Sequence, residues 1–211
     1  QRKNLRLFSA TETADLLGVT GQFLRKCHSD GSLPEPKVIK NGRRFYSGEE
    51  ILQVRHFFEA SSRKPGKYLP GRREGDKLQV IQLMNFKGGS AKSTSAIHLC
   101  HYLALSGYRV LAIDLDPQGS LTGFCGIQTE LEFEGASIYD ALRYDDPVPM
   151  SEAVVETYFP GLHLAPARLV LSEFETETAV NAGRGVAFFE KLSLAIQAVE
   201  SESVVVVIDS A

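Results

Sequence analysis

The sequence predicts an α/β protein in which a domain built on a parallel sheet follows a smaller domain of helices and a hairpin. Two observations predict the sheet: β-branched runs alternate with segments of helical period from residue 78 onward, and the last run is uninterrupted. A third observation divides the chain. Residues 1–77 hold 16 Lys and Arg against 9 Asp and Glu, a net charge of +7, whereas the remainder holds 7 against 17, a net of −10. We therefore expect domains at residues 1–60 and 78–211, joined by a basic linker at 61–77.

The composition is that of an ordinary soluble globular chain, with 43% apolar and 23% charged residues among 211. No apolar run reaches the length of a membrane span, and no signal peptide opens the sequence. Three cysteines are scattered along the chain (Cys27, Cys100 and Cys125), so we expect free thiols in a reducing cytoplasm. Because the first residue is Gln1, we expect the true N-terminus to precede it.

Two short helices are expected to open the first domain. Ser9 and Glu12 can form a capping box, and Gly18 should end the helix that follows. Thr20 can cap a second helix. The inner face of that helix is expected to hold Phe23, Leu24 and Cys27. Its outer face offers polar side chains to a partner, namely Gln22, Arg25 and Lys26.

A basic hairpin is expected after these helices. Asn41 and Gly42 suit a two-residue turn with positive φ, which predicts strands on both sides of it within residues 37–46. Ser47 and Glu50 can form a second capping box. That box would open a helix carrying Ile51, Val54, Phe57 and Phe58. Two helices and a basic hairpin predict a winged helix-turn-helix, and residues 41–47 resemble the wing of MerR-type proteins.

We expect this first domain to bind DNA. The candidates to reach base edges are Gln22, Arg25 and Lys26, and the candidates to contact phosphates are Lys40, Arg43 and Arg44. The six basic residues of the linker could add non-specific contacts. The alternative is a small helical packing domain whose charged face meets only solvent.

The second domain opens on a candidate phosphate loop. A strand-like run at 78–84 leads toward Lys87-Gly88-Gly89-Ser90-Ala91-Lys92-Ser93-Thr94, where a segment of helical period begins. Glycines let backbone amides face an anion, and the start of a helix adds the positive end of its dipole. Lys92 would reach the β- and γ-phosphates, and the Ser93 hydroxyl would bind Mg²⁺. The alternative is a turn that binds no ligand.

Acidic residues end two further predicted strands. The apolar run 109–113 leads into Asp114 and Asp116, and the β-branched run 204–208 ends in Asp209. Between them we expect helices around 137–143, from 151 and over 188–199, and a short strand at 162–164. Because ligands bind at the carboxyl edge of a parallel sheet, these aspartates should share one site with the loop.

The loop pattern K-G-G-x-x-K-S, with a second lysine at Lys87, resembles the deviant Walker A motif of the ParA/MinD ATPases. The Asp-x-Asp-Pro-Gln motif at 114–118 and the strand ending in Asp209 extend that resemblance over residues 78–211. Ala91 departs from the glycine that most members carry. The resemblance implies a fold of the phosphate-loop NTPase class that uses ATP, ADP and Mg²⁺.

The same resemblance implies a role for each residue of the site. Lys92 would contact phosphates in its own subunit, and Lys87 would reach the nucleotide of the partner across a homodimer. Asp116 would position the attacking water, while Asp114 and Asp209 would support Mg²⁺ together with Ser93.

The implied function is plasmid partition by an ATPase that binds DNA as a nucleotide-dependent dimer, similar to the RepA branch of the family in repABC systems. The implied partners are operator DNA, non-specific DNA and a ParB- or RepB-type centromere-binding protein, on the nucleoid in the bacterial cytoplasm and without a membrane. The first domain would also repress its own operon. One alternative is a nucleotide-responsive transcriptional regulator without a transport role. A nitrogenase-iron-protein-like reductase is disfavoured, because Cys125 lacks a paired cysteine motif.

The family's adenine-contacting segment is expected beyond Ala211. We therefore do not expect residues 1–211 alone to be a fully competent ATPase.

Overall fold

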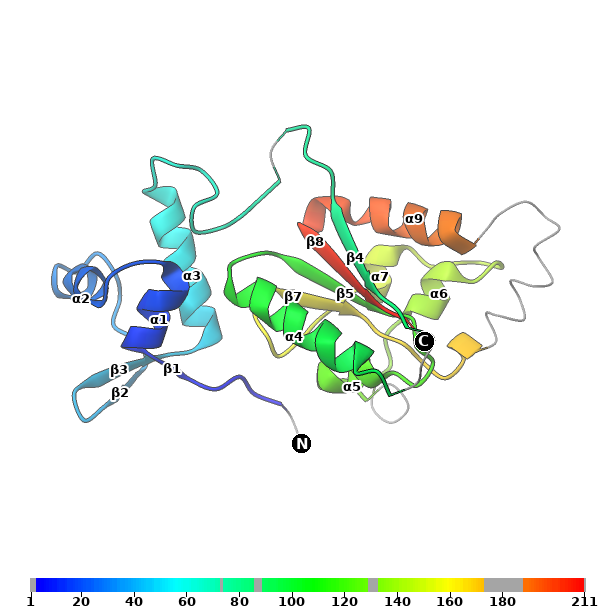
Figure 1. The fold of residues 1–211 in the computed structure, drawn as a ribbon, viewed down its shortest axis with the longest axis horizontal. Coiled ribbons are helices and arrows are strands. Elements are labelled where there is room, and N and C mark those ends of the chain that lie inside the picture. The colour runs from blue at the N-terminus through cyan, green and yellow to red at the C-terminus, as the bar shows by residue number, and fades with distance from the viewer. Residues whose placement is uncertain (1–2, 73, 86–88, 129–132, 173–187, 211) are drawn as a thin grey trace.

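The computed structural model describes residues 3–72, 74–85, 89–128, 133–172 and 188–210 (Figure 1). Its first group of elements comprises β1 (Phe8–Ser9), α1 (Ala10–Leu17), α2 (Gly21–Ser29), β2 (Val38–Lys40), β3 (Arg43–Tyr46) and α3 (Gly48–Ala60). The second group comprises β4 (Gln79–Leu83), α4 (Lys92–Leu105), β5 (Val110–Asp114), α5 (Ser120–Phe124), α6 (Ile138–Leu142), α7 (Met150–Ala153), β6 (Val155–Glu156), β7 (Leu162–Ala165), α9 (Phe188–Ala198), the 3-10 turn Glu200–Glu202 and β8 (Val205–Asp209).

Local side-chain signals fix where the first three helices begin. The capping boxes predicted at α1 and α3 are both present, with each serine accepting from the amide of its glutamate and each glutamate accepting from the amide of its serine. Thr20 accepts a hydrogen bond from the Phe23 amide at the start of α2, at 3.1 Å. Gly18 ends α1 in the left-handed conformation, with φ of 65°. The boundaries of these helices therefore follow from the sequence alone.

The first group of elements encloses a small core beside an antiparallel sheet of order β1-β3-β2. Asn41 and Gly42 form the predicted turn between β2 and β3, with φ of 50° and 71°. Leu24 and Cys27 are buried in the core. The prediction for Phe23 is wrong, because its side chain is 44% exposed. Leu24 and Cys27 supply the contact between α2 and the core, and the ring of Phe23 lies beside that of Phe58, with centroids 5.5 Å apart.

The chain after α3 folds back onto that helix. The Glu59 carboxylate accepts hydrogen bonds from three backbone amides of the following loop, those of Gly66, Tyr68 and Leu69. These bonds place the Tyr68 ring against Phe58, with ring centroids 5.3 Å apart. The first part of the basic segment 61–77 is thus held against α3.

The second group is built on a five-stranded sheet of order β4-β8-β5-β7-β6. The first four strands in this order pair in parallel, and β6 pairs antiparallel with β7. Register brings the ends of three strands together, since Leu83 and Asp114 both lie opposite Asp209. The carboxyl edge of this sheet therefore gathers the residues that follow β4, β5 and β8.

Helices cover both faces of this sheet, as a parallel sheet requires. Alternate residues of β5 and β8 point to opposite faces. Val110, Ala112, Val205 and Val207 pack against α4 and α5, whereas Leu111, Ile113, Val206 and Ile208 pack against α6, α7 and α9. Figure 1 shows α4 on one side of the strands and α9 on the other. Strand β4 lies at the edge of the sheet, and its Val80 and Ile81 side chains are exposed.

None of the helices that the structure describes is long and apolar enough to cross a membrane.

Candidate functional site

The start of α4 has no side-chain cap at its N-cap residue. Ala91 precedes the helix in the left-handed conformation, with φ of 59°, and its side chain supplies no cap to the first amides. Uncapped amides at the positive end of a helix dipole form a ready site for an anion. Lys92 is half-buried, and its ammonium donates to the carbonyl of Asn85 at 3.4 Å. The Ser90 hydroxyl is buried and has no partner among the described residues.

Asp209 lies at the end of β8, in the centre of this edge. Its carboxylate is fully buried, and neither oxygen has a hydrogen-bond partner among the described residues. Burial raises the pKa of Asp209, and the Asp116 charge raises it further, whereas the nearby Ser93 hydroxyl and Lys92 ammonium oppose that rise. Burying a carboxylate without hydrogen-bond partners costs free energy of folding. Its presence in a native fold therefore requires an explanation.

Asp114 is also fully buried, but its carboxylate accepts hydrogen bonds from within the protein. The amide and hydroxyl of Thr122 donate to Oδ2 at 2.8 and 2.7 Å, and the Asp116 amide donates to Oδ1 at 3.2 Å. Burial raises the pKa of Asp114 to about 6, although these hydrogen bonds act in the other direction. The structure thus gives Asp114 a part in fixing the loop after β5. The role of Thr122 could not be predicted from the sequence, because nothing in its local pattern distinguishes it from a surface threonine.

Asp116 lies on the loop between β5 and α5. It is half-buried, and its Oδ1 accepts from the Gln118 amide at 2.9 Å in a tight turn. It is close enough to influence the ionisation of Asp209. The structure therefore brings together Lys92, Ser93, Asp116 and Asp209, as the sequence predicts. Gly89 and Thr94 are exposed beside them, whereas Lys87 and Gly88 lie outside the described residues.

The donor set of this edge fits a small divalent cation. Mg²⁺ is bound by oxygen ligands, and usually only one or two of them are protein carboxylates. The described residues offer one buried carboxylate without partners, Asp209, next to the Ser93 hydroxyl. This orphaned carboxylate is the observation that a bound cation would explain.

Three of the predicted DNA-contacting residues, Arg25, Arg43 and Arg44, line one groove of the first group of elements. Gln22, Arg25 and Lys26 are exposed on α2, and Lys40 and Arg43 are exposed on the hairpin. A groove of about 580 Å³ is lined by the starts of α1 and α2, by Arg25 and by the hairpin residues 42–45. Arg44 is half-buried on the hairpin. Its guanidinium makes two hydrogen bonds of 2.6 Å to the Glu35 carboxylate, so it is already paired.

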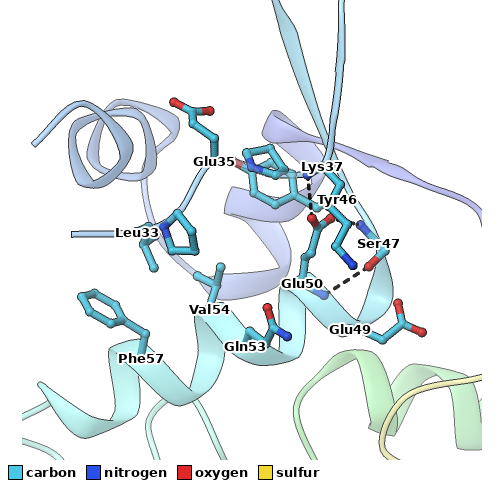
Figure 2. Close-up of a pocket in the computed structure, with 12 residues that line it drawn as sticks. Leu33, Glu35, Lys37, Tyr46, Ser47, Glu49, Glu50, Gln53, Val54 and Phe57 are labelled. Atoms are coloured by element: carbon cyan, nitrogen blue, oxygen red, sulfur yellow. Dashed lines mark hydrogen bonds between the residues drawn. The ribbon is translucent and has the colours of Figure 1, made fainter. Parts of the chain in front are cut away.

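A second pocket, of about 320 Å³, lies between α3 and residues 33–37 (Figure 2). None of the residues predicted to bind a ligand lines it. The Glu50 carboxylate fixes its rim, because it accepts from the amides of Lys37 and Ser47, both at 2.8 Å. Its apolar floor includes Leu33, Val54 and Phe57.

The sequence of this chain is similar to that of known proteins. A protein assigned as replication protein A in Sinorhizobium fredii is 45% identical over 99% of this chain and 53% of its own length. SopA of Escherichia coli is 31% identical over the whole of this chain and 54% of its own length. A family model described as an AAA domain matches residues 78–211, which is more than half of the chain. The chain belongs to the ParA family of partition ATPases.

Solved structures share the fold of this ParA-family chain. A cobyrinic acid a,c-diamide synthase from Mycobacterium smegmatis, solved with an ATP analogue and magnesium, is 33% identical and superposes with a TM-score of 0.56 over 63% of this chain and 51% of its own. A plasmid partition protein from Borrelia burgdorferi is 26% identical, with a TM-score of 0.52 over 64% of this chain and 56% of its own. The chain spans about half the length of the curated relatives that it matches.

Proposed function

We propose that this ParA-family protein is an ATP-dependent DNA-partition ATPase, which binds DNA as a nucleotide-dependent dimer and represses its own operon. The observation that carries the ATPase part is Asp209. Its buried carboxylate has no hydrogen-bond partner among the described residues and lies near Ser93 and Lys92, at the start of α4. A magnesium-bound nucleotide would supply both the cation and the anion that these groups lack.

Positively charged groups of the site would bind the phosphates, and oxygen ligands would bind the cation. The first amides of α4 and the Lys92 ammonium hold phosphate oxygens. Ser93 and Asp209 would hold Mg²⁺, and the bound cation would supply positive charge that stabilises the phosphate oxygens. Asp116 accepts a hydrogen bond from the attacking water and orients it. A relative solved with ATP analogue and magnesium, and another structure solved with ADP and magnesium, support this choice of ligand. Asp114 supports the site through the loop that it fixes.

The dimer is proposed from the two-lysine loop. Lys87 would reach the nucleotide of the partner subunit, so that two chains close around two nucleotides. Its role comes from the motif, since this lysine lies outside the described residues.

The DNA part is proposed from the first group of elements, which we interpret as a winged helix-turn-helix. One groove lined by Arg25 of α2 and by Arg43 of the hairpin supports this interpretation, and Gln22, Lys26 and Lys40 are exposed on the same two elements. Side chains on α2 would read base edges, and the wing would contact phosphates. Operator binding would repress the operon, and DNA on the nucleoid would carry the dimer. A ParB- or RepB-type centromere-binding protein would complete the partition system.

The test is ATP hydrolysis by the full-length protein, measured with and without DNA. We expect Mg²⁺-dependent turnover that DNA changes. Lys92→Ala should abolish nucleotide binding, whereas Lys87→Ala should bind nucleotide but fail to dimerise, as light scattering reports. Asp116→Ala should trap an ATP-bound dimer.

Two results would contradict parts of this proposal. Nucleotide binding without any hydrolysis would favour a nucleotide-responsive transcriptional regulator. Equal loss of binding in the two lysine variants would remove Lys87 from the site of the partner.

A further inference from the structure

The proposed function leaves one buried charge unexplained. Arg55 lies in the middle of α3 and is only 4% exposed. Among the ion pairs between described residues, none involves it. A buried guanidinium is costly unless other polar groups replace its hydration. Here the replacing groups are backbone carbonyls from three separate segments of the chain.

Two of those carbonyls belong to the last turns of helices. Nη2 of Arg55 donates to the carbonyls of Leu16 in α1 and Leu105 in α4, each at 2.6 Å, and Nη1 donates to the carbonyl of Tyr68 at 2.9 Å. The final carbonyls of a helix lack a donor within the helix and lie at the negative end of its dipole. One guanidinium therefore joins the ends of two helices, one from each domain. Figure 1 shows the end of α4 directed toward α3.

Glycines near Arg55 allow the backbone of one domain to approach the other closely. Gly107 follows α4 with φ of 94°, and a Cβ atom there would lie 2.7 Å from the Tyr68 carbonyl oxygen and 3.1 Å from Cδ of Arg55. Gly48, at the start of α3, is also tightly surrounded: a Cβ atom there would lie 2.7 Å from Cδ2 of Leu5 and 3.1 Å from the Pro160 ring. The ATPase domain thus contacts α3 near its start and at its middle.

A second cation of the first domain contacts the helix that neighbours α4. The Lys3 ammonium donates to the carbonyls of Gly123 and Phe124 in the last turn of α5, at 3.0 and 2.9 Å. Helix α4 begins at the candidate phosphate loop, and α5 begins after the loop that holds Asp114 and Asp116. The N-terminal domain therefore holds both of these helices from the end opposite to the nucleotide site.

We propose that Arg55 is a positioning residue that couples the DNA-reading helices to the nucleotide site through α4. The helix has 14 residues and so spans about 21 Å. Its start meets the nucleotide and its end is bonded to Arg55, so a shift on nucleotide binding reaches α1 through a single side chain. This inference rests on the proposed function for its nucleotide. Because linkage is reciprocal, DNA bound to α2 would alter nucleotide affinity by the same factor.

The experiment is hydrogen exchange of the full-length protein, with and without a non-hydrolysable ATP analogue and Mg²⁺. In the wild type, the analogue should slow exchange at residues 89–97 and also at residues 10–19, the latter by about fivefold or more. In Arg55→Ala, slowing at 89–97 should persist, while the effect at 10–19 should fall below about twofold. Arg55→Lys keeps the charge but offers a single donor nitrogen where Arg55 uses Nη1 and Nη2, and should give an intermediate effect.

Two control variants separate coupling from stability and charge. Val54→Ala removes a core contact from the same helix, and Arg63→Ala removes a positive charge from an exposed site. Both should keep the full effect at residues 10–19. If Arg55→Ala does not fold, Gly107→Ala disturbs the same contact from the ATPase side and should reduce the effect in the same way.

The outcomes distinguish this inference from the proposed function. If the analogue protects 89–97 in the wild type but leaves 10–19 unchanged, or if the Arg55 variants keep the full effect, the coupling role is wrong and the ATPase proposal stands. If the analogue protects nothing in the wild type, the proposed function fails and the coupling role fails with it.

Discussion

Thr122 donates two hydrogen bonds to one oxygen of Asp114, from its amide at 2.8 Å and from its hydroxyl at 2.7 Å. The same hydroxyl accepts from the Ala167 amide at 3.0 Å, so it joins β5, α5 and the segment after β7. These hydrogen bonds hold the Asp114 carboxylate within the protein. Asp209, on the neighbouring strand, has no such partner among the described residues, and it is the carboxylate that we propose for a cation.

Asp114 should make the folded protein less stable as the pH rises. Burial raises the pKa of its carboxyl from 3.8 to about 6, so the folded state binds the proton more tightly than the unfolded state. The stabilisation from this proton is complete below a pH of about 4 and is lost as the pH rises through about 6. A shift of this size corresponds to roughly 2–3 kcal/mol.

Asp114→Asn removes this titration. Urea unfolding from about pH 4 to about pH 7.5, without nucleotide, gives the free energy of unfolding of both proteins. The difference between them should move in favour of the variant by roughly 2–3 kcal/mol across that range. A difference that does not change with pH would show that Asp114 titrates as it does in the unfolded chain.

The two arginines of the wing should differ in their effect on DNA binding. Arg43 is exposed, so Arg43→Ala should weaken binding to operator and random DNA alike and lower the salt slope by about one unit. Arg44 is already bonded to Glu35 and should matter less. Arg25→Ala, on α2, should instead cost about 1–3 kcal/mol on the operator and relax its specificity.

Glu35→Gln provides a matched test of the ion pair. It should free the Arg44 guanidinium and strengthen non-specific binding, and this gain should disappear when Arg44→Ala is added. Binding isotherms over a salt series report all of these effects. Equal losses in Arg43→Ala and Arg44→Ala would show that the pair with Glu35 opens on DNA.

Ala91→Gly should stabilise the protein. Ala91 has φ of 59°, and a left-handed residue with a Cβ atom costs on the order of 1–2 kcal/mol. The greater freedom of glycine in the unfolded chain offsets about half of that, so a net gain of about 0.5–1 kcal/mol is expected in urea unfolding. Ala141→Gly, inside α6, is the control and should destabilise by roughly the same amount. A loss of stability in Ala91→Gly would contradict the backbone assignment of the loop.

Local chemistry made part of this fold predictable. The capping boxes at Ser9 and Ser47 act within four residues, and the run 204–208 is apolar because β8 is covered on both faces. The aspartates that end β5 and β8 follow from the same reasoning. The sequence did not predict which of the two carboxylates accepts hydrogen bonds within the protein, because that depends on Thr122 in α5.

Tertiary contacts decided the remaining features. Arginine is ordinarily exposed, and the arrival of α1 and α4 at the same point buries Arg55. Arg44 reads as a free cation, and its pairing requires the chain at Glu35 to return to the hairpin. Phe23 has the spacing of a core residue, but the core is filled without it. Each case turns on a neighbour distant in sequence.

The most direct test of the nucleotide site is the Mg²⁺ dependence of ATP affinity, measured by fluorescence titration of the full-length protein with a labelled ATP analogue. The wild type should bind the analogue more tightly when Mg²⁺ is present. Asp209→Asn should lose most of that gain, at least tenfold, which corresponds to about 1.4 kcal/mol. It should keep its affinity in the absence of Mg²⁺, because Lys92 and the amides of α4 remain, and Asp114→Asn should keep more of the gain. An Asp209→Asn variant with undiminished Mg²⁺ dependence would contradict the assignment of this carboxylate to the cation.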